Sequence, residues 1–491
     1  MRASWSGLVV QSLTNVRSML TGYDGTCKPY DASLTTGIRY SSCDDTNWPP
    51  PGPGHNVGTL LKPQTPDRAL QGALASVSTE HIRDNIAKLV SFGTRHTLSS
   101  QDDPERGVGA ARSWIAGEFR RYAEEADTGL LDVEIPGYVQ GPAERVPEPV
   151  WVGNVQATLR GTSDPARHYV TMGHYDTRVT DPLNWWDDQP GANDDASGVA
   201  VAMEVARVMA RYEHAASVVF AAVAGEEQGL LGSRFLAQTM RNASVSVEGV
   251  LNMDIVGSST GSRGEREPHA VRVFCQGAPL TESDDKTRQR QSIGAENDSP
   301  ARNLGRFIAE VAGNSFTGMR IALVYRLDRF LRGGDHRSFL EAGYTSSVRF
   351  SEPNENFAHQ HQDLRVEHGV QYGDLEEFLD YEYIARVARV NLAALWSLAN
   401  APGLVRNVTV DTSVLDNDTK LSWVRSEPQS DGVEGYEIVW RPTTAPQWTH
   451  AQFVGDVDSA TVELSIDNVI FGVRAVGKNG YKSPATVPFP R

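Results

Sequence analysis

Cysteines and long apolar runs are scarce in this sequence, and each scarcity excludes a class of protein. Only Cys27, Cys43 and Cys275 occur among the 491 residues. None lies in a C-x-x-C pair, which argues against a metal site built from thiolates. A disulfide between Cys27 and Cys43 is one interpretation, and it would leave Cys275 free. No run of about 18 apolar residues occurs, so we expect no membrane-spanning helix.

Positive charge is also in deficit. The chain has 62 acidic and 46 basic residues, which gives a net charge of −16. Such a surface repels nucleic acid and anionic membranes, so we expect neither as a partner. The hydrophobic fraction of 40% and the charged fraction of 22% are ordinary for a globular protein. The length predicts two or three domains of roughly 100–200 residues each.

Three regions with different residue patterns follow one another along the chain. Residues 1–77 have no sustained period and contain the segment WPPPGPG, so we expect an irregular N-terminal extension or prosegment. Residues 78–402 alternate short apolar runs with helical stretches, and they form the predicted main domain. Residues 405–491 show short alternating strands between turn residues, which predicts a small antiparallel all-β sandwich.

The main domain contains four predicted strands, and the run 217–225 is apolar or small almost throughout. The four strands cover residues 168–173, 217–225, 248–257 and 345–350, and a long helical run over 375–399 ends the domain. Strands that are buried on both faces and alternate with helices indicate an α/β fold. We therefore predict a mixed, largely parallel sheet flanked by helices.

Acidic and imidazole side chains are concentrated where these strands end. Parallel strands bring their carboxyl ends to one edge of a sheet, so residues distant in sequence can converge there. The residues are His174, Asp176, Asp194, Asp195, Glu226, Glu227, Asp254, His359, His361 and Asp363. Alone, each has an ordinary explanation as a helix cap, a surface carboxylate or a loop histidine. Together they place several costly polar groups beside buried strands, and a shared cation explains them all.

The types of ligand indicate zinc. Imidazole and carboxylate donors without thiolates are typical of a hydrolytic Zn²⁺ site that keeps an open position. Two ions roughly 3.5–4 Å apart need one carboxylate between them. An adjacent pair such as Glu226 and Glu227 can supply one metal ligand and one general base.

The motifs H-x-D, P-G-A-x-D-D-A-S-G, E-E-x-G-L-x-G-S and M-D, in this order, resemble those of the two-zinc aminopeptidase family of metallopeptidase clan MH, typified by secreted bacterial leucine aminopeptidase. The resemblance spans roughly residues 78–402 and implies a zinc exopeptidase fold. It also implies two zinc ions per chain and a secreted, extracellular enzyme. Residues 1–20 lack the apolar core of a signal peptide. Glycosylation of a eukaryotic secreted chain would use the sequons at Asn242, Asn297, Asn407 and Asn417.

The resemblance also assigns roles to individual residues. The implied metal ligands are His174, Asp194, Glu227, Asp254 and His359, with Asp194 between the two ions. Glu226 matches the general base, and Asp176 matches the carboxylate that supports the first histidine. Asp195 matches a residue that follows a cis peptide bond in the family.

Downstream of these motifs, the chain offers two candidate histidine ligands and departs from the bacterial prototype. The family has a histidine followed four residues later by an aspartate, which His359 and Asp363 fit, and His361 is the alternative ligand. The bacterial prototype carries a disulfide pair just before its Asp-His segment, whereas this chain has RFLRGG there. The pocket for the substrate's first side chain is therefore expected to differ from that of the prototype.

The implied activity is the release of N-terminal amino acids from peptides with a free N-terminus. In the family's mechanism a metal-activated hydroxide attacks the first peptide carbonyl, and Glu226 transfers the proton to the leaving amine. Alternatives on the same scaffold are a glutaminyl cyclase-like enzyme, which works with one zinc ion, and a glutamate carboxypeptidase-like enzyme. A non-catalytic receptor-like ectodomain would be expected to have lost ligands, and all of them are present in this chain.

The C-terminal region resembles a fibronectin type III module. Trp423, Tyr436 and the ending FGVRAVGKNGYKS match the core tryptophan, a central strand and the final hairpin of that module. The resemblance implies an immunoglobulin-like sandwich, with attachment, substrate docking or stability as its possible roles. The sequence leaves the preferred first residue of the substrate and the oligomeric state open.

Overall fold

A large mixed sheet forms the centre of the main domain. The computed structural model describes residues 57–426 and 432–491, and in it eight strands follow the order β10-β9-β11-β8-β6-β7-β5-β2. The strands are β2 (Leu131–Glu134), β5 (Val155–Leu159), β6 (Asp164–His174), β7 (Ala216–Val223), β8 (Ser246–Met253), β9 (Ala270–Cys275), β10 (Arg320–Val324) and β11 (Ser347–Ser351). The central strands β11, β8, β6 and β7 are parallel, whereas β9 and β5 run antiparallel to them. The predicted α/β fold with a mixed sheet is confirmed.

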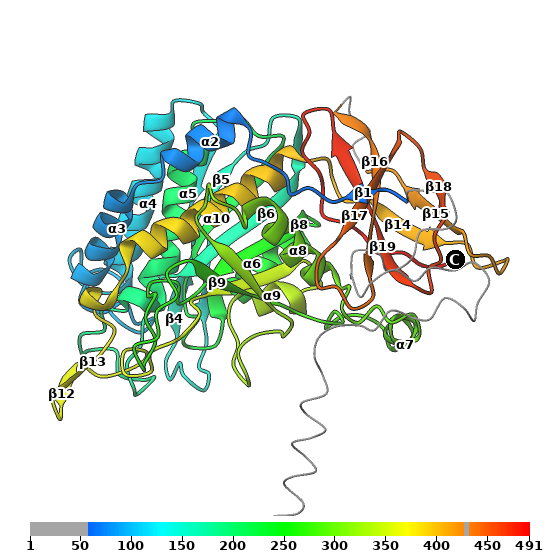
Figure 1. Cartoon of the computed structure of the whole chain (residues 1–491). Coiled ribbons are helices and arrows are strands. Elements are labelled where there is room, and N and C mark those ends of the chain that lie inside the picture. The colour runs from blue at the N-terminus through cyan, green and yellow to red at the C-terminus, as the bar shows by residue number, and fades with distance from the viewer. Residues whose placement is uncertain (1–56, 427–431) are drawn as a thin grey trace, which may run out of the picture. The chain divides into compact units, whose positions relative to one another are not determined.

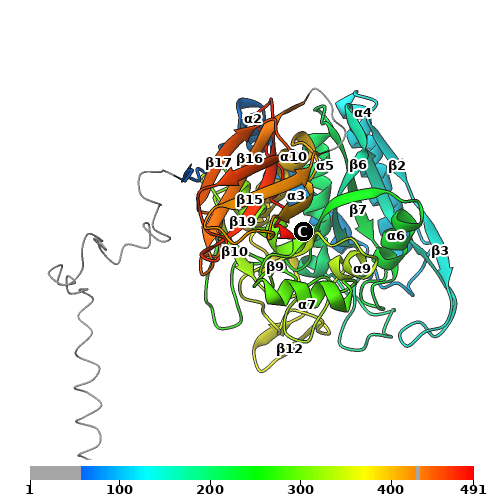
Figure 2. The same ribbon diagram turned by 90° about the vertical axis from the view of Figure 1, so that its right-hand side faces the viewer.

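Helices cover both faces of this sheet (Figures 1 and 2). The helices of the described ranges are α2 (Arg68–Ala75), α3 (Thr79–Ser91), α4 (Val108–Ala126), α5 (Ser197–Met209), α6 (Leu231–Asn242), α7 (Asp284–Ser292), α8 (Pro300–Ala312), α9 (His336–Glu341) and α10 (Tyr381–Asn400), of which α7 lies at the periphery. Successive residues of a strand face opposite sides of the sheet. Tyr169 of β6 accordingly packs in the core formed with α3, α4, α5, α8 and α10. Val170 packs instead with Leu236 of α6 and Phe339 of α9.

Helix α10 is shorter than the predicted helical run. It begins at Tyr381, where the Asp380 side chain accepts a hydrogen bond from the Tyr383 amide. A separate 3₁₀ turn, Glu376–Phe378, precedes it. The predicted start at residue 375 is therefore wrong, because Asp380 caps the helix and Leu379 has an extended backbone. Within the described ranges, no helix is long and apolar enough to cross a membrane.

Two four-stranded sheets form the C-terminal region, in the orders β1-β17-β16-β19 and β18-β15-β14-β20. Their strands are β1 (Thr59–Leu60), β14 (Arg406–Val410), β15 (Thr419–Val424), β16 (Val433–Pro442), β17 (His450–Gly455), β18 (Ser459–Val462), β19 (Val469–Gly477) and β20 (Phe489–Pro490). Both sheets contribute to one core that contains Trp423, Tyr436 and Phe471. The pairing is antiparallel except between β14 and β20, which are parallel. The fibronectin type III resemblance remains an interpretation of this region.

The N-terminal extension is not irregular over residues 57–77. Strand β1 pairs antiparallel with β17, and the Trp440 Nε1 atom donates to the Val57 carbonyl at 3.1 Å. Asp67 caps helix α2, which buries Leu70. The prediction is therefore wrong for this part, because β1 completes a sheet with partners almost 400 residues away and α2 packs on the main core.

Residues 1–56, including the Cys27–Cys43 pair, lie outside the described residues. Cys275 is a buried free thiol.

A buried ion cluster joins the C-terminal sheets to the start of α8. The Asp298 carboxylate accepts two hydrogen bonds of 2.8 Å from Arg441 Nη2 and one of 3.0 Å from Arg306. All three side chains are at most 2% exposed. The two regions are therefore joined by more than the linker around Pro402.

Two small hairpins complete the described structure, β3 (Gly137–Gln140) with β4 (Val150–Gly153) and β12 (Arg365–Glu367) with β13 (Val370–Tyr372). The connection between β3 and β4 carries Arg145, and the two histidines 359 and 361 precede β12.

Candidate metal centre

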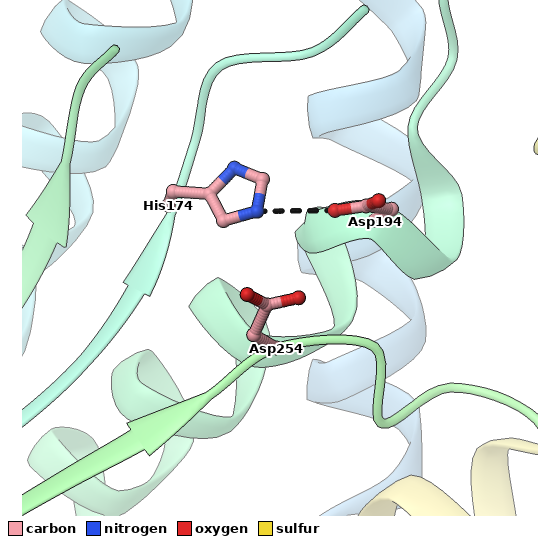
Figure 3. Close-up of side chains that lie close together, drawn as sticks. All are labelled: His174, Asp194 and Asp254. Carbon is pink, nitrogen blue, oxygen red and sulfur yellow. Dashed lines mark ion pairs between the residues drawn. The ribbon is translucent and has the colours of Figure 1, made fainter. Parts of the chain in front are cut away.

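Four of the five predicted ligands converge at the carboxyl ends of the parallel strands. His174 is the last residue of β6, and Asp254 follows β8 directly. Glu227 lies shortly after β7. Asp194 lies in the distorted turn Ala192–Ala196 that precedes α5. In Figure 3 the side chains of His174, Asp194 and Asp254 point toward a common space.

Two groups of potential ligands share Asp194. The first contains His174, Asp194 and Asp254, and the second contains Asp194, Glu227 and His361; in each, the ligand atoms lie within 4.8 Å of one another. His174 Nε2 is 3.0 Å from Asp194 Oδ1. His361 Nε2 is 2.9 Å from Asp194 Oδ2 and 2.7 Å from Glu227 Oε1. The two oxygens of Asp194 thus face different groups, as a bridging ligand requires.

The donor set fits zinc. Neither group contains a cysteine, and both combine imidazole nitrogen with carboxylate oxygen. Ligand atoms around a tetrahedral zinc ion are about 3.4 Å apart, given metal–ligand bonds of about 2.0–2.2 Å. The distances of 2.7 to 3.0 Å between direct partners, with an upper limit of 4.8 Å in each group, bracket that value. Small side-chain shifts would therefore suffice to bind an ion in either group.

The acid–base properties of these groups reflect their mutual contacts. Burial opposes ionisation of Asp194, but hydrogen bonds from His174 and His361 hold the pKa of its carboxyl well below the usual range. Burial also disfavours the charged form of His361, yet Glu227 and Asp194 raise the pKa of its imidazole to about 10. In the metal-free protein these opposite charges neutralise one another, and a metal ion would take the place of the proton on the histidine.

His361, and not His359, belongs to the second group. The His359 ring stacks on Phe378 with centroids 3.6 Å apart. The Asp363 carboxylate accepts from the Thr180 amide at 3.3 Å. The structure therefore brings His361, and not His359, together with Asp194 and Glu227. The ligand role predicted for His359 passes to His361 as a proposal.

Asp176 and Asp195 hold the ligand loops together. The Asp176 carboxylate accepts 3.1 Å hydrogen bonds from the amides of Glu226 and Glu227, and the Asp176 carbonyl lies 3.1 Å from His174 Nδ1. The Asp195 carboxylate accepts from the amides of His174 and Gly198. The Asp194–Asp195 peptide bond is cis, as the family resemblance implies. The Asp176 carboxylate thus fixes the amides of the glutamate pair, whereas it lies 3.7 Å from His174 Nδ1 and only the Asp176 carbonyl is within hydrogen-bond distance of that ring.

Two further buried residues position ligands, and sequence reasoning missed both. The Asp374 carboxylate accepts from the Asn193 amide at 2.8 Å and from the Asp194 amide at 2.7 Å. Arg349 of β11 forms an ion pair of 2.6 Å with Asp254. Neither residue lies in a motif, so only its position in the fold connects it with the site.

Glu226 differs from the ligands because its carboxylate is not engaged. Across residues 57–426 and 432–491, no hydrogen bond or ion pair involves its side-chain oxygens. Burial raises the pKa of the Glu226 carboxyl well above its ordinary value, and Glu227 and Asp254 add to this effect. A carboxylate with a raised pKa beside a metal group is suited to accept a proton.

A cavity of about 540 Å³ opens onto the site. Glu226, Glu227, Asp194, Asp254 and His361 line its floor. This volume is within the range of about 300–1,000 Å³ that is typical of small-ligand sites. The fold and site together define a metallohydrolase whose ligands sit at the carboxyl edge of an α/β sheet.

Comparison with known proteins gives the family. A model of peptidase family M28 matches residues 154–381, which include every residue of both ligand groups. A probable zinc metalloprotease of Pyricularia oryzae is 64% identical over 453 residues, covering 92% of this chain and 90% of that protein. One of Pyrenophora tritici-repentis is 57% identical over 453 residues, covering 92% of each. The chain therefore belongs to peptidase family M28, together with these zinc metalloproteases.

Among solved structures, the LapA aminopeptidase of Legionella pneumophila aligns with a TM-score of 0.45 at 18% identity, over 66% of this chain and 73% of that chain.

Proposed function

We propose that this protein is an exopeptidase that removes N-terminal amino acids from peptides and uses two zinc ions. The observation that carries the proposal is the sharing of Asp194 between two ligand groups, one oxygen to each. A single-metal enzyme would need only one such group. The arrangement therefore favours an aminopeptidase over a glutaminyl cyclase. The motif resemblance to two-zinc aminopeptidases also supports this proposal.

His174, Asp194 and Asp254 would hold one zinc ion, and Asp194, Glu227 and His361 the other. Zinc bound there supplies Lewis-acid polarisation of the scissile carbonyl and a lowered pKa for water. Asp176 and Asp374 keep the ligand-bearing backbone fixed through the amide hydrogen bonds described above.

Glu226 is the general base in this proposal. Its free carboxylate takes the proton from the attacking water and then delivers it to the amine of the departing peptide. The contacts of Asp176 with the amides of residues 226 and 227 orient this carboxylate toward the cavity. The carboxylates that line the cavity can also accept hydrogen bonds from the α-amine of a substrate.

The proposal is tested with the zinc-loaded protein and three substrates. These are an aminoacyl anilide with a free amine, the same compound with an acetylated amine, and a peptide with N-terminal glutamine. We expect hydrolysis of the free aminoacyl anilide but not of its acetylated form, and no cyclisation of the glutamine peptide. Activity should be lost on chelation and recovered with zinc. Cyclisation of the glutamine peptide without hydrolysis of the anilide would instead identify a cyclase. Hydrolysis of the acetylated compound at an equal rate would contradict an exopeptidase that requires a free N-terminal amine.

A further inference from the structure

Four arginines line the cavity above the metal groups. They are Arg145, Arg178, Arg329 and Arg332. Arg145 comes from the β3–β4 connection and Arg178 from the loop after β6, whereas the other two come from the segment after β10. Three separate segments thus bring guanidinium groups to one cavity. The chain as a whole has more acidic than basic residues, so this local concentration of arginine does not follow from its overall composition.

Arg145 and Arg178 have little anionic compensation. Arg145 donates a 2.8 Å hydrogen bond to the Glu227 carbonyl, and no carboxylate of the described chain lies within ion-pair distance of it. Arg178 donates to the carbonyls of residues 179 and 180, and its closest carboxylate oxygen is Glu227 Oε2 at 3.8 Å. Both guanidiniums therefore lie beside a metal-ligand residue but are not neutralised by it.

The part of the cavity lining that comes from the segment after β10 also has an excess of positive charge. Glu355 is shared by Arg272 at 2.9 Å, Arg329 at 3.3 Å and Arg332 at 2.7 Å. Asp328 gives Arg329 a second partner at 3.1 Å but also pairs with Arg349. Arg332, whose side chain is 31% exposed, thus forms its ion pair with a carboxylate that also pairs with two other arginines.

The metal groups do not need these arginines for charge balance. Their three carboxylates, Asp194, Glu227 and Asp254, carry three negative charges, which two divalent ions with four positive charges would more than offset. The guanidiniums would then face a site without surplus negative charge. A planar guanidinium is suited to bind a carboxylate with two parallel hydrogen bonds.

We infer that the cavity selects substrates that carry a carboxylate, which Arg145 and Arg178 bind directly and which Arg332, in the same lining, also attracts. The inference rests on the proposed function, because it concerns the substrate of the same site. An amine bound beside the metal groups and a carboxylate bound by the arginines would be ends of one small molecule. The carboxylate has two possible sources, which are an acidic first side chain and the free C-terminus of a dipeptide.

Matched substrate pairs distinguish these sources. The first pair is a glutamyl and a glutaminyl anilide, which differ only in side-chain charge. The second pair is the dipeptide Leu-Gly and its C-terminal amide. With zinc-loaded protein we expect kcat/KM to be roughly ten- to a hundredfold higher for the carboxylate member of one pair, the usual strength of a charge-assisted hydrogen bond. The pair that shows this preference identifies the source.

Two variants test the arginines themselves. Arg145→Gln and Arg178→Gln should each lower kcat/KM for the carboxylate substrate more than for its neutral partner, so that the preference falls by about tenfold. Arg145→Lys should keep part of the preference, because it keeps the charge without the planar fork. Arg160→Gln changes an exposed arginine outside the cavity and serves as the matched control, with the preference unchanged.

The results separate this inference from the proposed function. Equal kcat/KM for both members of both pairs would overturn the inference while leaving an aminopeptidase. A uniform loss in the arginine variants, without a change in preference, would also overturn it. If no anilide or dipeptide is hydrolysed, the proposed function fails. The inference is then decided by calorimetric binding to the zinc-loaded Glu226→Gln variant. The ligands are Leu-Gly with its amide, and Glu-Gly-amide with Gln-Gly-amide. Tighter binding of the carboxylate member, lost in Arg145→Gln, would still support the inference, whereas equal binding would overturn it.

Discussion

His214 is expected to make the main domain sensitive to acid. Its side chain is buried, its Nδ1 lies 3.0 Å from the Asn400 amide nitrogen, and its ring packs edge-on against Trp396. Burial lowers the pKa of the imidazole to about 4, compared with about 6.5 in an unfolded chain. Between these two pH values the unfolded chain binds a proton that the folded protein excludes. This contribution to stability is therefore complete above pH 6.5 and is lost as the pH falls toward 4.

The size of the effect follows from the two pKa values. Between pH 7 and pH 4.5 the free energy of unfolding should fall by about 2 kcal/mol because of this residue alone. Urea unfolding of metal-free wild type and His214→Gln at both pH values measures it, since subtraction removes the titrations that the two proteins share. We expect the pH dependence of the variant to be smaller by about that amount. An identical pH dependence in both proteins would refute the reasoning.

Three further outcomes follow from the structure. Asp194→Ala should lose both zinc ions while Asp254→Ala loses one, and metal analysis that finds one ion lost from each would contradict a bridging ligand. His361→Ala should lower zinc content whereas His359→Ala should not. The reverse result would return the ligand role to His359, as its spacing to Asp363 predicts. Asp298→Ala should lower the free energy of unfolding in urea by roughly 3–5 kcal/mol, because it leaves two buried guanidiniums unpaired. A change below about 1 kcal/mol, the usual value of an exposed pair, would show that the cluster is not buried in solution.

Much of the fold and site could be predicted because the relevant signals are local. The run 217–225 is apolar throughout, and it forms the buried strand β7 with Glu226 and Glu227 just beyond its end. Asp254 likewise follows directly on a buried strand. A costly carboxylate at such a position has few explanations other than a bound cation.

The parts that could not be predicted depend on contacts between distant residues. Spacing could not show whether the ring of His359 or that of His361 faces Asp194, since stacking on Phe378 decides it. Asp374 acts through hydrogen bonds to amides about 180 residues away, so no motif marks it. Strand β1 was missed for the same reason, because two residues gain their structure from pairing with β17.

Some predictions remain open. The four sequon asparagines, Asn242, Asn297, Asn407 and Asn417, are all exposed, as glycosylation would require, and secretion stays a prediction. The role of the C-terminal sheets is also untested. Their ion cluster with Asp298 and their pairing with β1 do indicate that removing residues 405–491 would disturb more than a linker.

The central claim is that Glu226 moves the proton while Glu227 and its partners hold metal, and the Glu226→Gln variant tests it most directly. Zinc content and turnover of an aminoacyl anilide should be measured on the same sample, with Glu227→Gln as the matched control. We expect zinc near the wild-type level in Glu226→Gln and kcat lower by about 10²–10⁴-fold, because only the proton acceptor is lost. Glu227→Gln should instead lose zinc, since Glu227 belongs to a ligand group. Full turnover by zinc-loaded Glu226→Gln would contradict the account.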